Sequence, residues 1–303
     1  MVMWLSKCSL FNVGTIFLCL ILLLLIVIDP TMQAYDHHTN NKASKFVEHF
    51  LGSRKGDNMI GIHHIKQYFA KYGYLSPSHV QTDSNNDGHF NDELEAAVKK
   101  YQVFFHLNVS GVLDSKTLSL MGTPRCGNSD HDADRTLQQH NITKSFYVLH
   151  PTKWNKRNLS FSIKPGTRPD ATDPINSAIA AWDRVSALTF VGDEFSKADL
   201  KFSFLKGEHG DNNPFDGPGN ELGHSFYPPN GNIHIDADEK WVVGKFTGGV
   251  EFDIYTLVLH EIGHAIGLEH SSVESSIMWP VQFPGTIKDL GKDDIDGIKA
   301  LYP

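Results

Sequence analysis

Residues 260–270 read H-E-I-G-H-A-I-G-L-E-H, and this stretch decides the fold. His260 and His264 are four residues apart, so on a helix both imidazoles project from one face and can converge on one metal ion. Gly267 can end that helix in a left-handed conformation, and the reversed chain can return His270 as a third ligand. Three neutral nitrogens leave the fourth tetrahedral position of Zn²⁺ open to water, which is the arrangement of a catalytic zinc site.

Further features separate this stretch from an amphipathic helix that carries histidines by chance. Glu261, beside the first histidine, is placed to take a proton from the water. The glycine, the third histidine and the downstream Met278 each meet a separate geometric need. The pattern resembles the metzincin zinc endopeptidases, and Ser271 directly after the third histidine resembles their matrixin branch, the matrix metalloproteinases. By that resemblance Met278 forms the turn beneath the zinc ligands and does not bind metal.

The overall composition excludes some classes of function. The chain has 303 residues, which leaves room for a signal segment and two modest domains. The formal net charge is −8, and no long basic run occurs outside the short N-terminal segment, so nucleic-acid binding has little support. A modest acidic excess is compatible with a secreted protein that has calcium sites.

The N-terminus is predicted to be a secretory signal peptide. Residues 11–28 form a leucine-rich run without charge, and we expect cleavage after Ala34. Because Met32 is a poor cleavage cue and the run is long enough to span a bilayer, a signal anchor in the plasma membrane is the alternative. The chain has no hydrophobic C-terminal tail, so no stable membrane anchor is expected after signal removal. Three N-x-S/T sequons support secretion and predict glycosylation at Asn108, Asn141 and Asn158.

Cys126 is the thiol that remains once the signal segment and its two cysteines are removed. It lies in residues 124–130, P-R-C-G-N-S-D, which resemble the matrixin cysteine switch P-R-C-G-x-P-D. A thiolate is a good zinc ligand and can occupy the fourth position in place of water, which keeps the enzyme latent. The alternative is a buried, inert cysteine. Arg125 could pair with Asp130 or with a carboxylate near the cleft, whereas Ser129 in place of the usual proline is expected to loosen the loop.

Three regions are expected: a signal peptide at residues 1–34, a propeptide at 35–145 and a catalytic domain at 146–303. The propeptide resembles that of matrixins, which is itself similar to peptidoglycan-binding domains. It is predicted to have three helices, the third opening near Asp114. Polar residues dominate 127–145 without periodicity, which predicts an exposed linker that an activating protease can cut. Helical spacing of apolar residues is seen at Ile62, Ile65, Tyr68 and Phe69, and at Leu94, Ala97, Val98, Tyr101 and Phe105.

The catalytic domain is predicted to have an α+β fold. Residues 159–163 and 200–204 alternate like strands. Asp173-Pro174 is predicted as a helix N-cap followed by proline in the first turn, and residues 293–298 begin the last helix. The resemblance implies a metzincin fold with a twisted, mostly parallel five-stranded sheet, an antiparallel edge strand and three helices. In active relatives the first aspartate of the last helix can receive the new N-terminal ammonium, which makes Asp293 a candidate for that role.

A second metal region is expected between residues 209 and 239. The alternation at residues 232–236 places two potential ligands on one face of a strand and two isoleucines on the other. A loop of solvated polar residues is the alternative, but the resemblance implies a structural zinc and at least one calcium. The implied zinc ligands are His209, Asp211, His224 and His234, a closed shell that stabilises and does not catalyse. The implied calcium ligands are the side chains of Asp216, Asp236 and Glu239 and the backbone carbonyls of Gly217, Gly219 and Glu221.

Loop length refines the resemblance. The segment between His224 and His234 is shorter than in the animal enzymes and lacks their G-x-G-x-D loop, so a second calcium is not expected. The short loop, the compact propeptide and the absence of a hemopexin-like domain resemble the plant-type matrixins.

The predicted function is a secreted, latent, zinc-dependent endopeptidase of extracellular proteins. A peptide substrate is expected to lie along the edge strand near Leu222-Gly223. By the resemblance, a hydrophobic pocket beside residues 280–282 selects the side chain after the cut. Further expected partners are an activating protease and inhibitors similar to tissue inhibitors. The runner-up is a secreted metal-binding or adhesion module with an inert zinc site, against which intact Glu261 and Cys126 argue.

Overall fold

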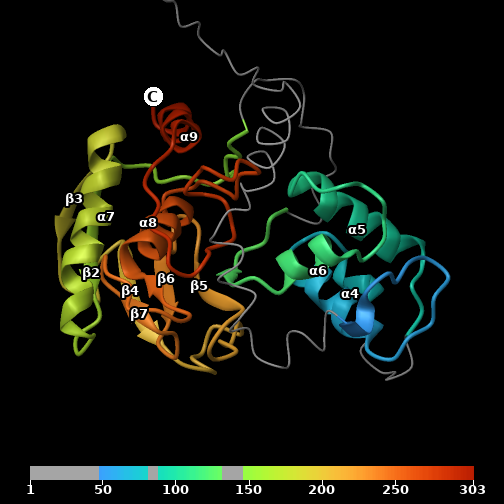
Figure 1. Ribbon diagram of the computed structural model, residues 1–303. Helices are drawn as coiled ribbons and strands as arrows, with labels where there is room; N and C mark the ends of the chain where they lie inside the picture. The colour runs from blue at the N-terminus through green and yellow to red at the C-terminus, as the bar shows by residue number, and fades with distance from the viewer. Residues whose placement is uncertain (1–47, 81–87, 132–145) are drawn as a thin grey trace, which may run out of the picture. The chain divides into compact units, whose positions relative to one another are not determined.

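The computed structural model describes residues 48–80, 88–131 and 146–303 (Figure 1). The predicted signal peptide and the sequon at Asn141 lie outside these ranges. Among the helices that are described, none is both long enough and apolar enough to cross a membrane.

The N-terminal helical region has the three helices that were predicted. Their bounds are α4 (Ile62–Lys71), α5 (Asp92–Phe104) and α6 (Ser115–Met121), with a 3₁₀ turn η1 (Pro77–His79) after the first. Asn91 caps α5 by accepting a hydrogen bond from the backbone amide of Leu94 at 3.1 Å, and Asp114 caps α6 in the same way. The apolar residues with helical spacing turn inward, and Leu94 and Tyr101 are fully buried.

The second region is built on a twisted sheet. The strands are β1 (Arg125–Cys126), β2 (Asn158–Ile163), β3 (Thr189–Gly192), β4 (Leu200–Leu205), β5 (Glu221–Ser225) and β6 (Asn232–Asp236). Their order is β1-β5-β6-β4-β2-β3, and each neighbouring pair is parallel except β5 with β6. The predicted five strands and the antiparallel β5 are confirmed. The sixth strand, β1, comes from the cysteine-bearing segment and covers the free edge of β5.

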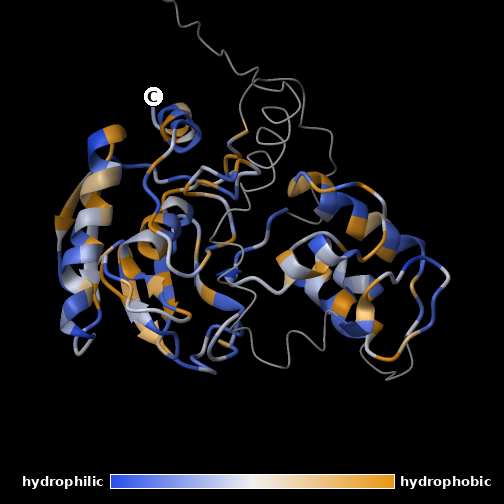
Figure 2. Cartoon of the chain, in the orientation of Figure 1, coloured by the Kyte–Doolittle hydropathy of each residue, from blue (hydrophilic) through white to orange (hydrophobic). Residues whose placement is uncertain are grey.

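Three helices complete this part of the molecule, as predicted: α7 (Thr172–Val185), α8 (Ile254–Ala265) and α9 (Lys292–Leu301). The short strands β7 (Trp241–Val242) and β8 (Phe252–Asp253) form a separate parallel pair before α8. Hydrophilic and hydrophobic residues alternate along α7, as expected of a helix with one buried side (Figure 2). The buried indole of Trp182 joins two helices, because its Nε1 donates to the carbonyl of Leu259 at 2.9 Å.

The start of α7 differs from the prediction. The helix begins at Thr172, and Ala171 holds the N-cap position without a side-chain hydrogen bond. A 3₁₀ turn η3 (Pro169–Ala171) runs directly into the helix, so backbone continuity replaces a capping side chain. Asp173 therefore lies in the first turn, where its charge still complements the positive end of the helix dipole.

The two regions have separate hydrophobic cores. One core contains buried side chains from Trp154 to Tyr302 and packs α7 and α8 on the sheet. The other is formed by the N-terminal helices together with Trp279 and Val281 from the second region. Trp279 stacks on Phe104 at a ring-centroid separation of 6.2 Å, so the contact between the regions lies beside the cysteine-bearing strand.

Candidate active site

Helix α8 carries the first two histidines of the 260–270 stretch. Asp253 caps it by accepting from the Thr256 backbone amide at 2.9 Å. Gly267 follows the helix with a φ of 105°, a positive value that favours glycine, and this reverses the chain as the sequence predicted. The returning segment places His270 beside the helix. His264 and His270 are both fully buried, so the site is withdrawn from bulk solvent.

The three Nε2 atoms of these histidines converge on one point. His260 Nε2 lies 3.1 Å from that of His264 and 3.2 Å from that of His270, and the third separation is 3.1 Å. Cys126 Sγ lies 3.5 Å from His264 Nε2 and completes a buried group of four potential metal ligands. The structure therefore brings together all four residues that the sequence proposed for this site.

Hydrogen bonds at Nδ1 of His260 and His264 determine whether the Nε2 atom of each ring carries a proton or a lone pair. Nδ1 of His260 faces the carbonyl of Ile277 at 2.6 Å, and Nδ1 of His264 faces the carbonyl of Leu268 at 2.8 Å. A carbonyl can only accept, so both Nδ1 atoms carry the proton. Burial lowers the pKa of each ring well below its usual range, so the rings are neutral and their Nε2 lone pairs face one another. Such lone pairs repel unless a cation lies between them, so the donor set fits a zinc ion.

Met278 and Asp294 support the floor of this site. The buried Asp294 carboxylate accepts from the backbone amides of Ile277 and Met278 at 2.9 and 3.2 Å, which fixes the turn beneath the histidines. Met278 packs against α8 at Gly263, where a side chain would overlap the methionine sulfur and lie 3.3 Å from the Trp182 ring.

We expect Gly263→Ala to destabilise the protein by about 1–3 kcal/mol. The added methyl group would displace Met278, and overpacking of this kind outweighs the roughly 1 kcal/mol that alanine contributes to helix propensity. Urea unfolding followed by circular dichroism measures the change. Gly192→Ala is the matched control, because a side chain there meets nothing within 4 Å. Equal stability of the two variants would contradict this packing argument.

Glu261 is buried next to His260, and one of its two carboxylate oxygens is held by a hydrogen bond. Its Oε2 accepts a hydrogen bond from the hydroxyl of Ser225 at 2.6 Å, whereas Oε1 has no hydrogen-bond partner among the residues described. Burial raises the pKa of Glu261 to about 7, although the hydrogen bond from Ser225 opposes the rise. The hydrogen bond to Oε2 thus orients the carboxylate, and Oε1 can still accept a hydrogen bond or a proton.

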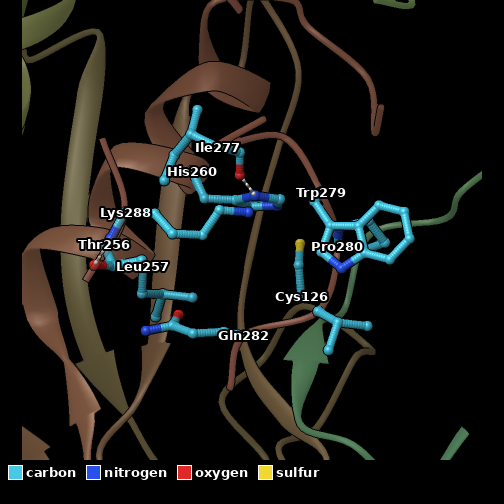
Figure 3. Close-up of a pocket in the computed structure, with 10 residues that line it drawn as sticks. Cys126, Thr256, Leu257, His260, Ile277, Trp279, Pro280, Gln282 and Lys288 are labelled. Atoms are coloured by element: carbon cyan, nitrogen blue, oxygen red, sulfur yellow. Dashed lines mark hydrogen bonds between the residues drawn. The ribbon is translucent and has the colours of Figure 1, made fainter. Parts of the chain in front are cut away.

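Strand β1 lies between two segments and is hydrogen-bonded to both, which places Cys126 beside the histidines. On one side, the amide of Arg125 donates to the carbonyl of Asn220, just before β5, at 2.7 Å, and the amide of Gly127 donates to the carbonyl of Gly223 in β5 at 2.8 Å. On the other side, the amide of Cys126 donates to the carbonyl of Pro280 at 2.9 Å. Figure 3 shows the Cys126 side chain pointing toward the ring of His260.

Asp130 joins the cysteine segment to a histidine. Its Oδ1 accepts from Arg125, as the sequence suggested, and from Nδ1 of His270 at 2.7 Å, while Oδ2 accepts from the Tyr74 hydroxyl at 2.7 Å. Although burial opposes ionisation, the charge of Arg125 and the bond from His270 hold the pKa of Asp130 below its usual range.

The loop after Cys126 is held by more contacts than its sequence indicated. The Asn128 side chain makes two hydrogen bonds with the backbone of Ser225, both at 2.9 Å. The Ser129 hydroxyl donates to the carbonyl of His131 within the turn. These contacts replace the stiffness that a proline would supply, so the expected loosening at Ser129 is compensated.

The second predicted metal cluster also forms. His209 Nε2, His224 Nε2 and His234 Nδ1 lie 2.9, 2.8 and 2.8 Å from Oδ2 of Asp211. His209 directs its Nδ1 at the carbonyl of Gly207 (2.8 Å), which leaves its Nε2 with a lone pair. An unprotonated nitrogen facing a carboxylate oxygen is repelled unless a cation lies between them, so this donor set also fits a zinc ion.

Three carboxylates predicted to bind calcium lie near one another. Glu239 accepts from the Gly219 amide at 2.5 Å, and Oδ2 of the buried Asp236 has no hydrogen-bond partner among the residues described. Burial, followed by repulsion from Asp236 and Asp216, raises the pKa of Glu239 to about 7. A hard cation bound by these oxygens would relieve the repulsion. Gly217 and Gly219 both have positive φ, as the tight loop between these residues requires.

Comparison with known proteins agrees with this geometry. The matrixin family model matches residues 153–303, and the putative peptidoglycan binding domain model matches residues 61–121. The chain is similar to Metalloendoproteinase 2-MMP of Arabidopsis thaliana, with 38% identity over 84% of this chain and 73% of the relative. Metalloendoproteinase 1 of Glycine max is 38% identical over 84% of this chain and 85% of the relative. Interstitial collagenase of Bos taurus is 35% identical over 78% of this chain and 48% of the relative. The chain belongs to the matrixin family.

Membership in this family establishes that the protein is a metalloendopeptidase of a zinc-dependent family.

A pocket lies beside His260, between the start of α8 and residues 280–282 (Figure 3). One wall is polar, because Lys288 donates from its Nζ to the carbonyls of Glu274 and Ser276 at 2.7 and 2.6 Å. Burial lowers the pKa of Lys288 to about 8. The lining residues are Cys126, Thr256, Leu257, His260, Ile277, Trp279, Pro280, Val281, Gln282 and Lys288.

Several positions that shape the matrixin site were missed from the sequence. Ser225, Asn128 and Asp294 act through contacts with residues 16 to 97 positions away, and none belongs to a motif that names a partner. Only Asp294 could have been recognised from the sequence, because it is a second aspartate beside Asp293 at the predicted start of a helix. The Asp293 carboxylate accepts from the Ser271 hydroxyl at 2.7 Å and lies near the backbone amides of Phe146 and Tyr147.

Proposed function

We propose that this matrixin is made as a secreted, latent zinc endopeptidase that cleaves extracellular proteins. The position of Cys126 carries the proposal, because its sulfur faces three histidine nitrogens where a substrate would have to reach the metal. The domains are a signal peptide at 1–34, a propeptide at 35–145 and a catalytic domain at 146–303. Exposure of Asn108 and Asn158 is compatible with glycosylation there.

His260, His264 and His270 hold the catalytic zinc, and Cys126 is its fourth ligand in the latent form. Bound zinc supplies a Lewis acid for the scissile carbonyl and lowers the pKa of a coordinated water. The chain's own contribution is orientation: the carbonyls of Ile277 and Leu268 fix two of the rings.

Glu261 is the general base. Ser225 holds one carboxylate oxygen, and the other is free to take a proton from water and later return it to the leaving amine. The raised pKa of Glu261 suits both transfers, since a base that must also act as an acid works best near neutral pH. The fully buried position excludes bulk water from the carboxylate.

The cysteine switch blocks the substrate groove as well as the metal. Strand β1 takes the backbone hydrogen bonds of β5 that an extended substrate would use, including those to Gly223. Removal of the propeptide frees this edge. We propose that a protease cuts between residues 131 and 146 and that Asp293, which lies near the backbone amides of Phe146 and Tyr147, holds the new N-terminus.

Two further metal sites stabilise the catalytic domain. His209, Asp211, His224 and His234 hold a structural zinc, supported by the convergence of their ligand atoms. Asp216, Asp236 and Glu239, with the carbonyls of Gly217, Gly219 and Glu221, hold calcium, supported by the unpartnered carboxylate oxygen of Asp236. Both ions would join β5 and β6 to the long loop before them.

The direct test uses the full chain cut by limited proteolysis within residues 132–145. We expect the processed form to cleave a fluorogenic peptide, to lose this activity with a zinc chelator and to contain two zinc ions by mass spectrometry. Loss of zinc through His209→Ala should lower the melting temperature, whereas His264→Ala should abolish cleavage. A folded, processed protein that holds zinc and cleaves no peptide would refute the proposed function.

A further inference from the structure

Glu221 is a buried carboxylate at the start of β5, the strand against which the cysteine segment lies. Its side chain is 1% exposed. Oε1 accepts from Nδ1 of His224 at 2.6 Å and from the amide of Asn213 at 3.1 Å. Oε2 accepts from the ammonium group of Lys71. One oxygen therefore bonds within the catalytic domain, and the other meets a cation from outside it.

The groups that cover this carboxylate come from the propeptide. Lys71 is the last residue of α4, 150 positions before Glu221. Gly127 follows the switch cysteine and passes so close that a Cβ atom there would overlap Oε1 of Glu221. When the propeptide leaves, Glu221 loses both its cover and its cation.

The uncovered carboxylate would border the substrate groove. Glu221 lies two residues before Gly223, whose carbonyl binds the Gly127 amide and whose register partner is Cys126. Cys126, the residue opposite Gly223, carries the sulfur that faces the histidines. A substrate chain on β5 thus passes Glu221 within a residue or two of the bond to be cut.

We propose that Glu221 is a specificity-determining residue that binds a lysine or arginine side chain of the substrate close to the scissile bond. Lys71 occupies this place in the latent form and acts as an internal substitute for the substrate's cation. The inference rests on the proposed function, because it requires that the propeptide leave and a peptide take its place.

A purely structural role for Glu221 would not require its charge. The bond to His224 uses Oε1, and a neutral glutamine could accept the same hydrogen bond through its amide oxygen. The ammonium group on Oε2 is the contact that only a carboxylate balances. Glu221→Gln therefore separates recognition of a cation from support of the histidine.

The test compares paired peptides on the processed enzyme. Each pair carries lysine or norleucine at one of three positions on either side of the cleaved bond. At one position we expect lysine to raise kcat/KM by about five- to thirty-fold, as for a hydrogen-bonded contact between opposite charges. Glu221→Gln should abolish this preference. The readout is the ratio of lysine to norleucine cleavage within the variant, which does not depend on any change in its overall activity. High salt should weaken the preference.

The possible results separate the two proposals. A wild-type enzyme that cleaves both peptides equally at every position would overturn the role of Glu221, whatever the variant does. A lysine preference that persists in a folded Glu221→Gln protein would also overturn it. Failure of the processed wild type to cleave any peptide would instead refute the proposed function, on which this inference depends.

Discussion

Glu261→Gln in the processed protein should lower kcat/KM for peptide cleavage by about a thousandfold. Glutamine keeps the shape of the side chain and can still bond to Ser225, whose hydroxyl lies 2.6 Å from Oε2. It cannot accept the proton of the attacking water or deliver one to the leaving amine. Initial rates with a fluorogenic peptide give the ratio.

The zinc content identifies the cause of this loss. Because the three histidines are untouched, the variant should bind as much zinc as the wild type. Glu274→Gln is the matched control, since it removes a carboxylate from an exposed position a few residues after His270 and should retain full activity. Wild-type activity in a zinc-loaded Glu261→Gln protein would eliminate this residue as the base.

Cys126→Ser in the uncut chain should raise peptidase activity by about ten- to a hundredfold over the uncut wild type, because a hydroxyl is a far weaker zinc ligand than a thiolate. The increase stays below full activity because β1 still occupies the edge of β5 through its backbone. The measurement is the cleavage rate before any proteolysis, with electrophoresis to show that the chain is intact.

Proteolytic processing supplies the control for this variant. Once the residues before 146 are removed and separated, variant and wild type have the same sequence, and their rates should be equal. Equal rates before processing would mean that the sulfur does not cause latency. The remaining contacts of Arg125, Asn128 and Asp130 would then have to account for it.

The cluster of three histidines could be predicted because its information is local. The four-residue spacing of His260 and His264 fits one helical face, and the positive φ of Gly267 confirms how the chain returns to His270. The strands β2 and β4 were equally accessible, since alternation of apolar residues places one face on a core. Each of these predictions needed only a short window of sequence.

The contacts that hold the cysteine-bearing segment against the rest of the protein depend on distant residues and could not be predicted. Lys71 meets Glu221 across 150 positions, and Asn128 meets Ser225 across 97. Strand β1 is only two residues long and has no alternation to indicate it; it exists because β5 offers an unpaired edge. The misplaced N-cap at Asp173 has a similar cause, since a preceding 3₁₀ turn replaced the expected local signal.

The residues of the proposed switch whose contacts are described above all lie on the N-terminal side of the proposed cut. Arg125, Cys126, Asn128 and Asp130 precede residue 131, and the N-terminal core packs on Trp279 and Val281. A cut after residue 131 therefore severs the chain without breaking any of them. The freed fragment remains a bound inhibitor until it dissociates, so activation obeys mass action. Dilution after cutting should raise the activity reached at equilibrium, and an excess of the fragment should lower it again.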